Sequence, residues 1–142
     1  MEEGKLNIAI LGTRGIPNRY GGFEACAEQL ALRLAEMGHK VAVYCGHDYP
    51  VKDTQWQGIQ RIIKHNPEGL LGSSGQFLYD LYCNLDSSKR HFEVILHPGY
   101  TSDSIWYRLW TRNSIHLVNM DGMEWKREKY GKLTRRFLKW AE

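Results

Sequence analysis

The chain has 142 residues, of which 42% are apolar and 25% charged, and its formal net charge is +3. This length can bury the core of one domain, and the composition is ordinary for a globular protein. So small a net charge does not by itself indicate nucleic acid as a partner, and no apolar run reaches the ~20 residues that span a bilayer.

The cysteines are odd in number and far apart, at Cys26, Cys45 and Cys83. They form no Cys-x-x-Cys pair, so neither a zinc site nor a disulfide framework is indicated, and the histidines lack metal-ligand spacing. The acidic start, MEEGK, does not resemble a secretory signal. We therefore expect a cytoplasmic protein with reduced thiols, no metal and no bound cofactor.

The first third of the chain predicts a βαβ unit. The apolar run Leu6–Leu11, closed by Gly12, is typical of a buried strand, and Val41–Cys45 is a second one. Between them a helix is predicted from Phe23 to Gly38. Its apolar stripe consists of Ala27, Leu30, Leu34 and Met37. A strand, a helix and a strand at this spacing indicate two parallel strands.

The rest of the chain continues this alternation. We expect, in order, a strand at Gly58–Ile63, a loop at Pro67–Gly75, a helix over Phe77–Leu85, strands at Val94–Leu96 and Ile115–Val118 with an aromatic helix between them, and a last helix at Lys126–Trp140. The pattern predicts one α/β domain, residues 1–142, with a mostly parallel, Rossmann-like sheet and helices on both faces.

The loop between the first strand and the first helix reads TRGIPNRYGGFE from Thr13 to Glu24, and four glycines fall within Gly12–Gly22. Ligands of open parallel sheets lie beyond the carboxyl ends of the strands, and a helix N-terminus favours an anion. The loop therefore predicts a phosphate-bearing ligand. Its spacing matches neither the dinucleotide fingerprint nor a P-loop. The alternative is that the glycines only form a tight turn.

Two segments carry a resemblance to a known family. GTRGIPNRYGGFE with the following helix to MGHKV, and VNMDGMEWKREKYGKLTRRFLKWAE at Val118–Glu142, resemble the N-terminal domain of family 4 glycosyltransferases of the GT-B fold. The match is with the rhamnosyltransferase-like subgroup, of the domain of unknown function 1972 type. The two segments bracket nearly the whole chain, so their joint occurrence is more specific than either alone.

The resemblance implies a retaining, metal-independent enzyme whose N-terminal domain holds the acceptor and whose C-terminal domain holds a nucleotide-diphosphate sugar as co-substrate. It implies transfer of a sugar such as rhamnose to a glycan or lipid-linked acceptor in surface polysaccharide synthesis, at the inner face of a membrane. The chain stops before a donor domain, so we expect no turnover without that domain in cis or trans.

The sequence leaves two other classes of function to consider. One is a non-enzymatic domain that binds a nucleotide or a glycan, which the missing donor half favours. The other is an NAD-dependent oxidoreductase, which the absent fingerprint and the lack of an acid after the second strand disfavour.

Site residues follow from the resemblance. Donor phosphate is assigned to Arg14, Gly15, Gly21 and Gly22, and the acceptor to Arg19, Tyr20, Glu24, His97 and Glu124. Each arginine could instead be a solvated loop charge, and Glu24 could simply complement the helix dipole. His97 could equally be a satisfied loop histidine.

Asp121 is the expected catalytic residue. It follows the strand Ile115–Val118, where related transferases carry a histidine. A carboxylate there could orient the sugar, accept a proton or stabilise developing positive charge. The alternative is a turn-forming Asp-Gly pair with Gly122.

The last predicted helix is basic and aromatic. Its membrane-facing bases are expected to be Lys126, Arg127, Lys132, Arg135 and Arg136. Such a helix suits an anionic membrane surface. Tyr130, Leu133, Phe137 and Trp140 are spaced three or four apart and are expected to face the core. RNA binding has no support beyond charge, so no nucleic-acid partner is expected.

Overall fold

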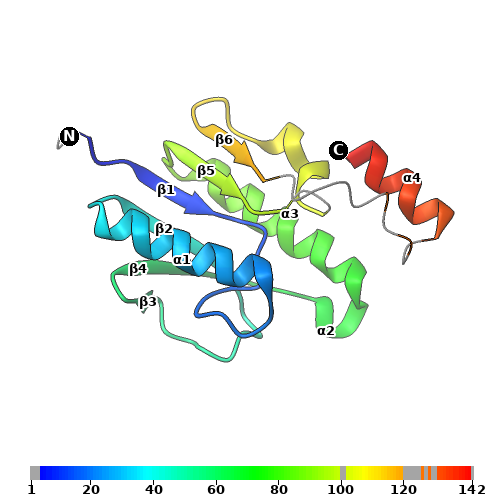
Figure 1. The fold of residues 1–142 in the computed structure, drawn as a ribbon, viewed down its shortest axis with the longest axis horizontal. Helices are drawn as coiled ribbons and strands as arrows, with labels where there is room; N and C mark the ends of the chain where they lie inside the picture. The colour runs from blue at the N-terminus through cyan, green and yellow to red at the C-terminus, as the bar shows by residue number, and fades with distance from the viewer. Residues whose placement is uncertain (1–3, 100–101, 120–125, 127, 129–130, 142) are drawn as a thin grey trace.

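The computed structural model describes residues 4–99, 102–119, 126, 128 and 131–141. This part of the chain forms a six-stranded sheet with helices on both faces (Figure 1). The strand order is β3-β4-β2-β1-β5-β6, and every described pairing is parallel except β3 with β4. The predicted α/β, Rossmann-like class is confirmed.

The elements in chain order are β1 (Asn7–Ile10), α1 (Gly22–Glu36), β2 (Lys40–Gly46), β3 (Gln55–Trp56), β4 (Ile59–Lys64), α2 (Glu68–Leu71), α3 (Ser73–Lys89), β5 (Val94–His97), the 3-10 helix η1 (Ser104–Leu109), β6 (Ile115–Val118) and α4 (Lys132–Ala141). All five predicted strands are present. The segment Pro67–Gly75, predicted to be a loop, instead contains α2 and the first turn of α3.

β3 was not predicted, because it is a two-residue edge strand in a hairpin with β4. The hairpin turns at Gln57 and Gly58, and both residues have positive φ, 46° and 80°. A two-residue turn of this kind matches the twist of the paired strands, but it usually carries Asn-Gly or Asp-Gly. Gln-Gly is therefore a weak signal in the sequence.

The core lies on both faces of the sheet. On one face Val41, Val43 and Cys45 of β2 join Ala27 and Ala31 of α1. On the other, Ala42 and Tyr44 join Tyr79 and Cys83 of α3. Because both faces are covered, six of the seven residues of β2 are buried, which explains its continuous apolar run.

The predicted stripe of α1 is partly wrong. Ala27 is fully buried, but Leu30 is 37% exposed and Met37 is 70% exposed. The contact face is instead centred on the small residues Ala27 and Ala31, together with Glu24 of the first turn. The small side chains of Ala27 and Ala31 let α1 approach the sheet closely. The prediction placed the contact face by the large apolar residues and therefore missed it.

The predicted inward face of the last helix is also partly wrong. In α4 the buried residue is Leu138, and Phe137 is half-buried with its ring 5.7 Å from that of Phe77. Leu133 is 81% exposed and Trp140 is 69% exposed. The helix is thus rotated relative to the predicted stripe. Tyr130 lies outside the described residues.

Candidate functional site

The carboxyl ends of the parallel strands meet along one edge of the sheet, and the glycine-rich loop lies there between β1 and α1 (Figure 1). The first half of this loop belongs to the core. The backbone carbonyl of Thr13 accepts a hydrogen bond from the Tyr79 hydroxyl at 3.0 Å, and that of Ile16 accepts one from Arg61 Nε at 2.8 Å. Thr13, Gly15 and Ile16 are buried.

Gly15 fits where a side chain would not. Its φ is +145°, and a Cβ atom there would lie 3.1 Å from Cys45 and 3.2 Å from the Tyr49 ring. The predicted contact of Gly15 with donor phosphate stays a prediction, but the structure gives this glycine a packing role.

Arg14 is bound within the protein. Its guanidinium donates to both carboxylate oxygens of Glu68, at 2.8 and 3.3 Å, and lies over the Tyr20 ring at 5.4 Å from its centroid. The hydrogen bond from Arg14 is the largest cause that lowers the pKa of Glu68, and the reciprocal bond raises the pKa of Arg14. An anionic ligand would have to share or displace Glu68 to reach this guanidinium.

Glu24 holds the loop against the helix. Its side chain is buried, and its Oε1 atom accepts a hydrogen bond from the Arg14 backbone N–H at 3.1 Å. This contact gives Glu24 a third role, beside the acceptor contact and the helix-dipole role expected from the sequence, because it ties the start of α1 to the loop. The predicted contact of Glu24 with a sugar hydroxyl stays a prediction.

The second half of the loop faces solvent. Arg19, Tyr20, Gly21 and Gly22 are all exposed. The Asn18 side-chain oxygen accepts from the N–H groups of Tyr20 at 3.2 Å and Gly21 at 3.3 Å, which turns the chain into α1. A Cβ atom on Gly22 would meet nothing within 4 Å. The N–H groups of the first helical turn lack partners within the helix, so this end of α1 suits an anion.

Two cavities open beside this helix end. One, of about 420 Å³, is lined by Gly22, Phe23, Cys26 and Asn119. The other, of about 190 Å³, shares Cys26 and Asn119 and is otherwise mainly apolar, with Leu30, Leu96, His97, Pro98, Leu117 and Val118. A ligand at the N-terminus of α1 would therefore lie next to the carboxyl end of β6.

His97 ends β5 and is almost fully buried. Its Nδ1 atom bonds Asp103, and its Nε2 atom lies 3.0 Å from His116 Nδ1. Trp110 stacks on the His97 ring with centroids 4.4 Å apart. Both ring nitrogens are thus engaged, so the predicted contact of His97 with the acceptor would require one of these bonds to break.

His116 completes this chain of polar groups. Its Nε2 atom lies 3.2 Å from the Thr111 carbonyl, which can only accept, so we assign the proton to Nε2. Burial, followed by the charge of His97, lowers the pKa of His116. A neutral His116 then accepts at Nδ1 from His97, which links β5 to β6 through their side chains.

The last segment is only partly described. Asp121, Glu124 and Arg127 lie outside the described residues, so their predicted roles stay predictions. The remaining predicted bases are described: Lys126, Lys132 and Arg136 are exposed, and Arg135 is half-buried. Among the described residues, no group of three or more His, Cys, Asp or Glu side chains is arranged to hold a metal ion. None of the described helices has the length and hydropathy of a membrane span.

The geometry defines a Rossmann-like α/β domain with a glycine-rich loop, a helix N-terminus and two cavities at the carboxyl edge of its sheet. No protein-family model, curated protein or solved structure matches the chain.

Proposed function

We propose that the chain is the acceptor-side domain of a retaining glycosyltransferase. The enzyme would move a sugar, with rhamnose as the first to test, from a nucleotide-diphosphate donor to a glycan or lipid-linked acceptor in surface polysaccharide synthesis. The observation that carries the proposal is the open side of Gly22, which lines a cavity of about 420 Å³ at the N-terminus of α1.

This arrangement supports binding of the donor diphosphate. The exposed Gly21 and Gly22 allow a phosphate to approach the backbone, and the helix dipole stabilises negative charge there. Arg19 and Tyr20 are exposed on the same half of the loop and are assigned to the acceptor. Asn119 lines the cavity and precedes the proposed catalytic residue Asp121 by two positions.

A lipid-linked acceptor is supported by α4. Leu133 and Trp140 are exposed on this helix, beside the exposed bases Lys132 and Arg136. Exposed apolar and basic side chains on one helix suit an anionic bilayer surface. The proposed setting is therefore the cytoplasmic side of a membrane, with peripheral contact through α4.

The binding half of the proposal is tested by NMR titration of the chain with dTDP-rhamnose. We expect amide shifts at Gly21, Gly22 and Phe23, and we expect Gly22→Trp to abolish them. Gly131→Trp is a matched control, because a Cβ atom at Gly131 also meets nothing within 4 Å. Loop amides that stay unchanged at millimolar donor, both in the chain alone and with a donor domain added, would refute the phosphate site.

The catalytic half needs a donor domain added in cis or trans. Transfer from dTDP-rhamnose should then appear and be lost in Asp121→Ala. Transfer that survives both Asp121→Ala and Gly22→Trp would show that the site is wrongly assigned. Binding without transfer, in the presence of a folded donor domain, would instead favour the non-enzymatic binding domain.

A further inference from the structure

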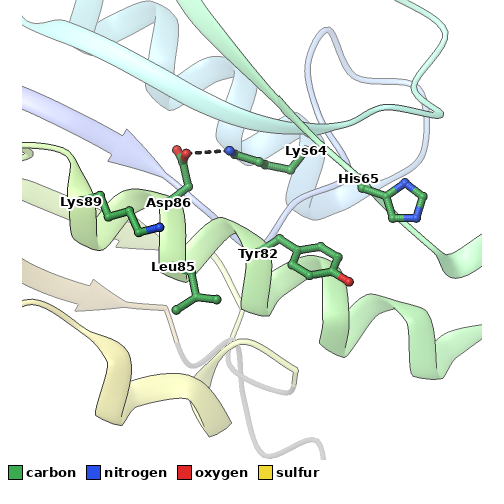
Figure 2. Close-up of a pocket in the computed structure, with 6 residues that line it drawn as sticks. All are labelled: Lys64, His65, Tyr82, Leu85, Asp86 and Lys89. Atoms are coloured by element: carbon green, nitrogen blue, oxygen red, sulfur yellow. Dashed lines mark hydrogen bonds and ion pairs between the residues drawn. The ribbon is translucent and has the colours of Figure 1, made fainter.

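A third cavity lies apart from the glycine loop, between the carboxyl end of β4 and the outer side of α3 (Figure 2). Its volume is about 410 Å³, and it is lined by Lys64, His65, Tyr82, Leu85, Asp86 and Lys89. None of these residues lines the two cavities beside α1. A volume of this size falls in the range of small-molecule sites.

One end of the cavity is positively charged. Asp86 accepts hydrogen bonds from Lys64 Nζ and Arg90 Nε, each at 2.6 Å, and from the Tyr44 hydroxyl at 2.7 Å. Burial would raise the pKa of Asp86, but the bonds from Arg90, Lys64 and Tyr44 outweigh it and lower that pKa. The carboxylate is thus ionised and well supplied with donors.

Of the lining residues, Lys64 and Lys89 are cationic and Asp86 is the one anion, and Arg90, beside the cavity, also pairs with Asp86, so cationic groups outnumber the carboxylate here. An ammonium group has three N–H donors, and Lys64 shows one bond, to Asp86. Asp86 therefore fixes the position of Lys64 without neutralising the site, and this end of the cavity attracts an anion.

The other end is aromatic. Figure 2 shows His65 and Tyr82 together, away from Asp86 and Lys89. Their ring centroids are 6.3 Å apart, and the His47 ring stacks on that of His65 with centroids 4.6 Å apart. Tyr82 is 37% exposed, so its ring is accessible from solvent. Exposed aromatic faces of this kind stack with planar rings such as nucleobases.

We propose that this cavity binds a nucleoside monophosphate, with the base on the His65–Tyr82 rings and the phosphate on the solvent side of the Lys64 and Lys89 ammonium groups. The ligand must carry both a planar ring and an anionic group, because the cavity offers aromatic faces at one end and ammonium groups at the other. Leu85, 39% exposed, lies near Asp86 and Lys89 in Figure 2 and adds an apolar surface on that side of the cavity.

The test is a calorimetric titration of the full chain with AMP and UMP. Adenosine lacks the phosphate and ribose 5-phosphate lacks the base, so each should bind at least about tenfold more weakly, the factor that one lost contact of ordinary strength produces. Failure of AMP and UMP to saturate the chain at millimolar concentration would overturn the proposal. So would equal affinity for ribose 5-phosphate.

Variants locate the site. Tyr82→Leu and Lys89→Ser change exposed side chains and should each weaken AMP binding about tenfold. The matched controls are Tyr107→Leu and Lys40→Ser, which change exposed residues outside the cavity and should leave binding unchanged. Binding that the controls weaken as much as the cavity variants would place AMP elsewhere.

A single-stranded oligonucleotide serves as the last arm. Tighter binding of a short oligoadenylate than of AMP, lost in Tyr82→Leu, would overturn the proposal in favour of a nucleic-acid surface. The inference is independent of the proposed glycosyl transfer, since it concerns different residues. Loss of one therefore leaves the other standing.

Discussion

Replacement of Arg61 by methionine should destabilise the domain by about 3 kcal/mol, because Arg61 is a buried cation that ties three chain segments together. It is 1% exposed, and its partners are the backbone carbonyls of Ile16 at 2.8 Å, Val51 at 2.9 Å and Asp53. A hydrogen bond from a charged donor contributes about 1.5–3 kcal/mol. The carbonyls near Val51 and Asp53 can regain water in the variant, whereas the buried Ile16 carbonyl cannot.

Urea unfolding followed by tryptophan fluorescence measures this loss. Arg33→Met is the control, because Arg33 pairs with Glu36 at the surface, with side chains 77% and 64% exposed, and should cost less than about 0.5 kcal/mol. Arg61→Lys should fall between the two, since an ammonium group cannot reach all three carbonyls in the same geometry. A cost below about 1 kcal/mol for Arg61→Met would refute the reasoning.

Three further predictions concern the Glu68–Arg14 pair, the packing of Gly75 and the reactivity of the cysteines. The pKa of Glu68 is lowered in the folded state, so its pair with Arg14 stabilises the fold above pH about 4.5, and this stabilisation is lost as the pH falls through the lowered pKa. In urea unfolding, Glu68→Gln should therefore lower the free energy of unfolding by about 0.5 kcal/mol at pH 7 and leave it unchanged at low pH. Gly75→Ala should destabilise the fold by about 2–3 kcal/mol in thermal unfolding, because the new Cβ atom would lie 2.5 Å from the Glu68 backbone. Gly69→Ala is the control: its Cβ atom has open space, so the change should be neutral or slightly stabilising. Equal effects of the two variants would contradict the predicted crowding. Ellman's reagent should react quickly with one thiol, that of Cys26, which is exposed. Cys45 and Cys83 should react only on unfolding, because both are buried and burial raises the pKa of each thiol. A second thiol that reacts quickly in the folded chain would disprove this.

The sequence was sufficient for the strands because parallel strands covered on both faces are continuous apolar runs. It was less informative for β4, where Ile-Gln-Arg-Ile-Ile suggests a strand but gives no reason to bury Arg61. The carbonyls that compensate this charge come from segments 8 to 45 positions away, and only the folded chain brings them together.

The same limit applies to the site. The sequence singled out His97 as a candidate site residue but not its partners Asp103, Trp110 and His116. These partners lie on other segments, and they come into contact with His97 only when β5 pairs with β6. The glycine loop could be predicted because it is local. Its division into a buried and an exposed half could not, because that depends on Arg61 and Tyr79, which are distant in sequence.

That division has an entropic consequence for binding. Residues 13–17 are ordered by contacts from α1, α3, β4 and Tyr49 before any ligand arrives. A ligand that meets this part of the loop loses little affinity to immobilising the chain. The hydrogen bonds within residues 18–21 are exposed to solvent, so more of any ordering penalty falls there. Substitutions that restrict the backbone in this half can raise affinity without adding a contact.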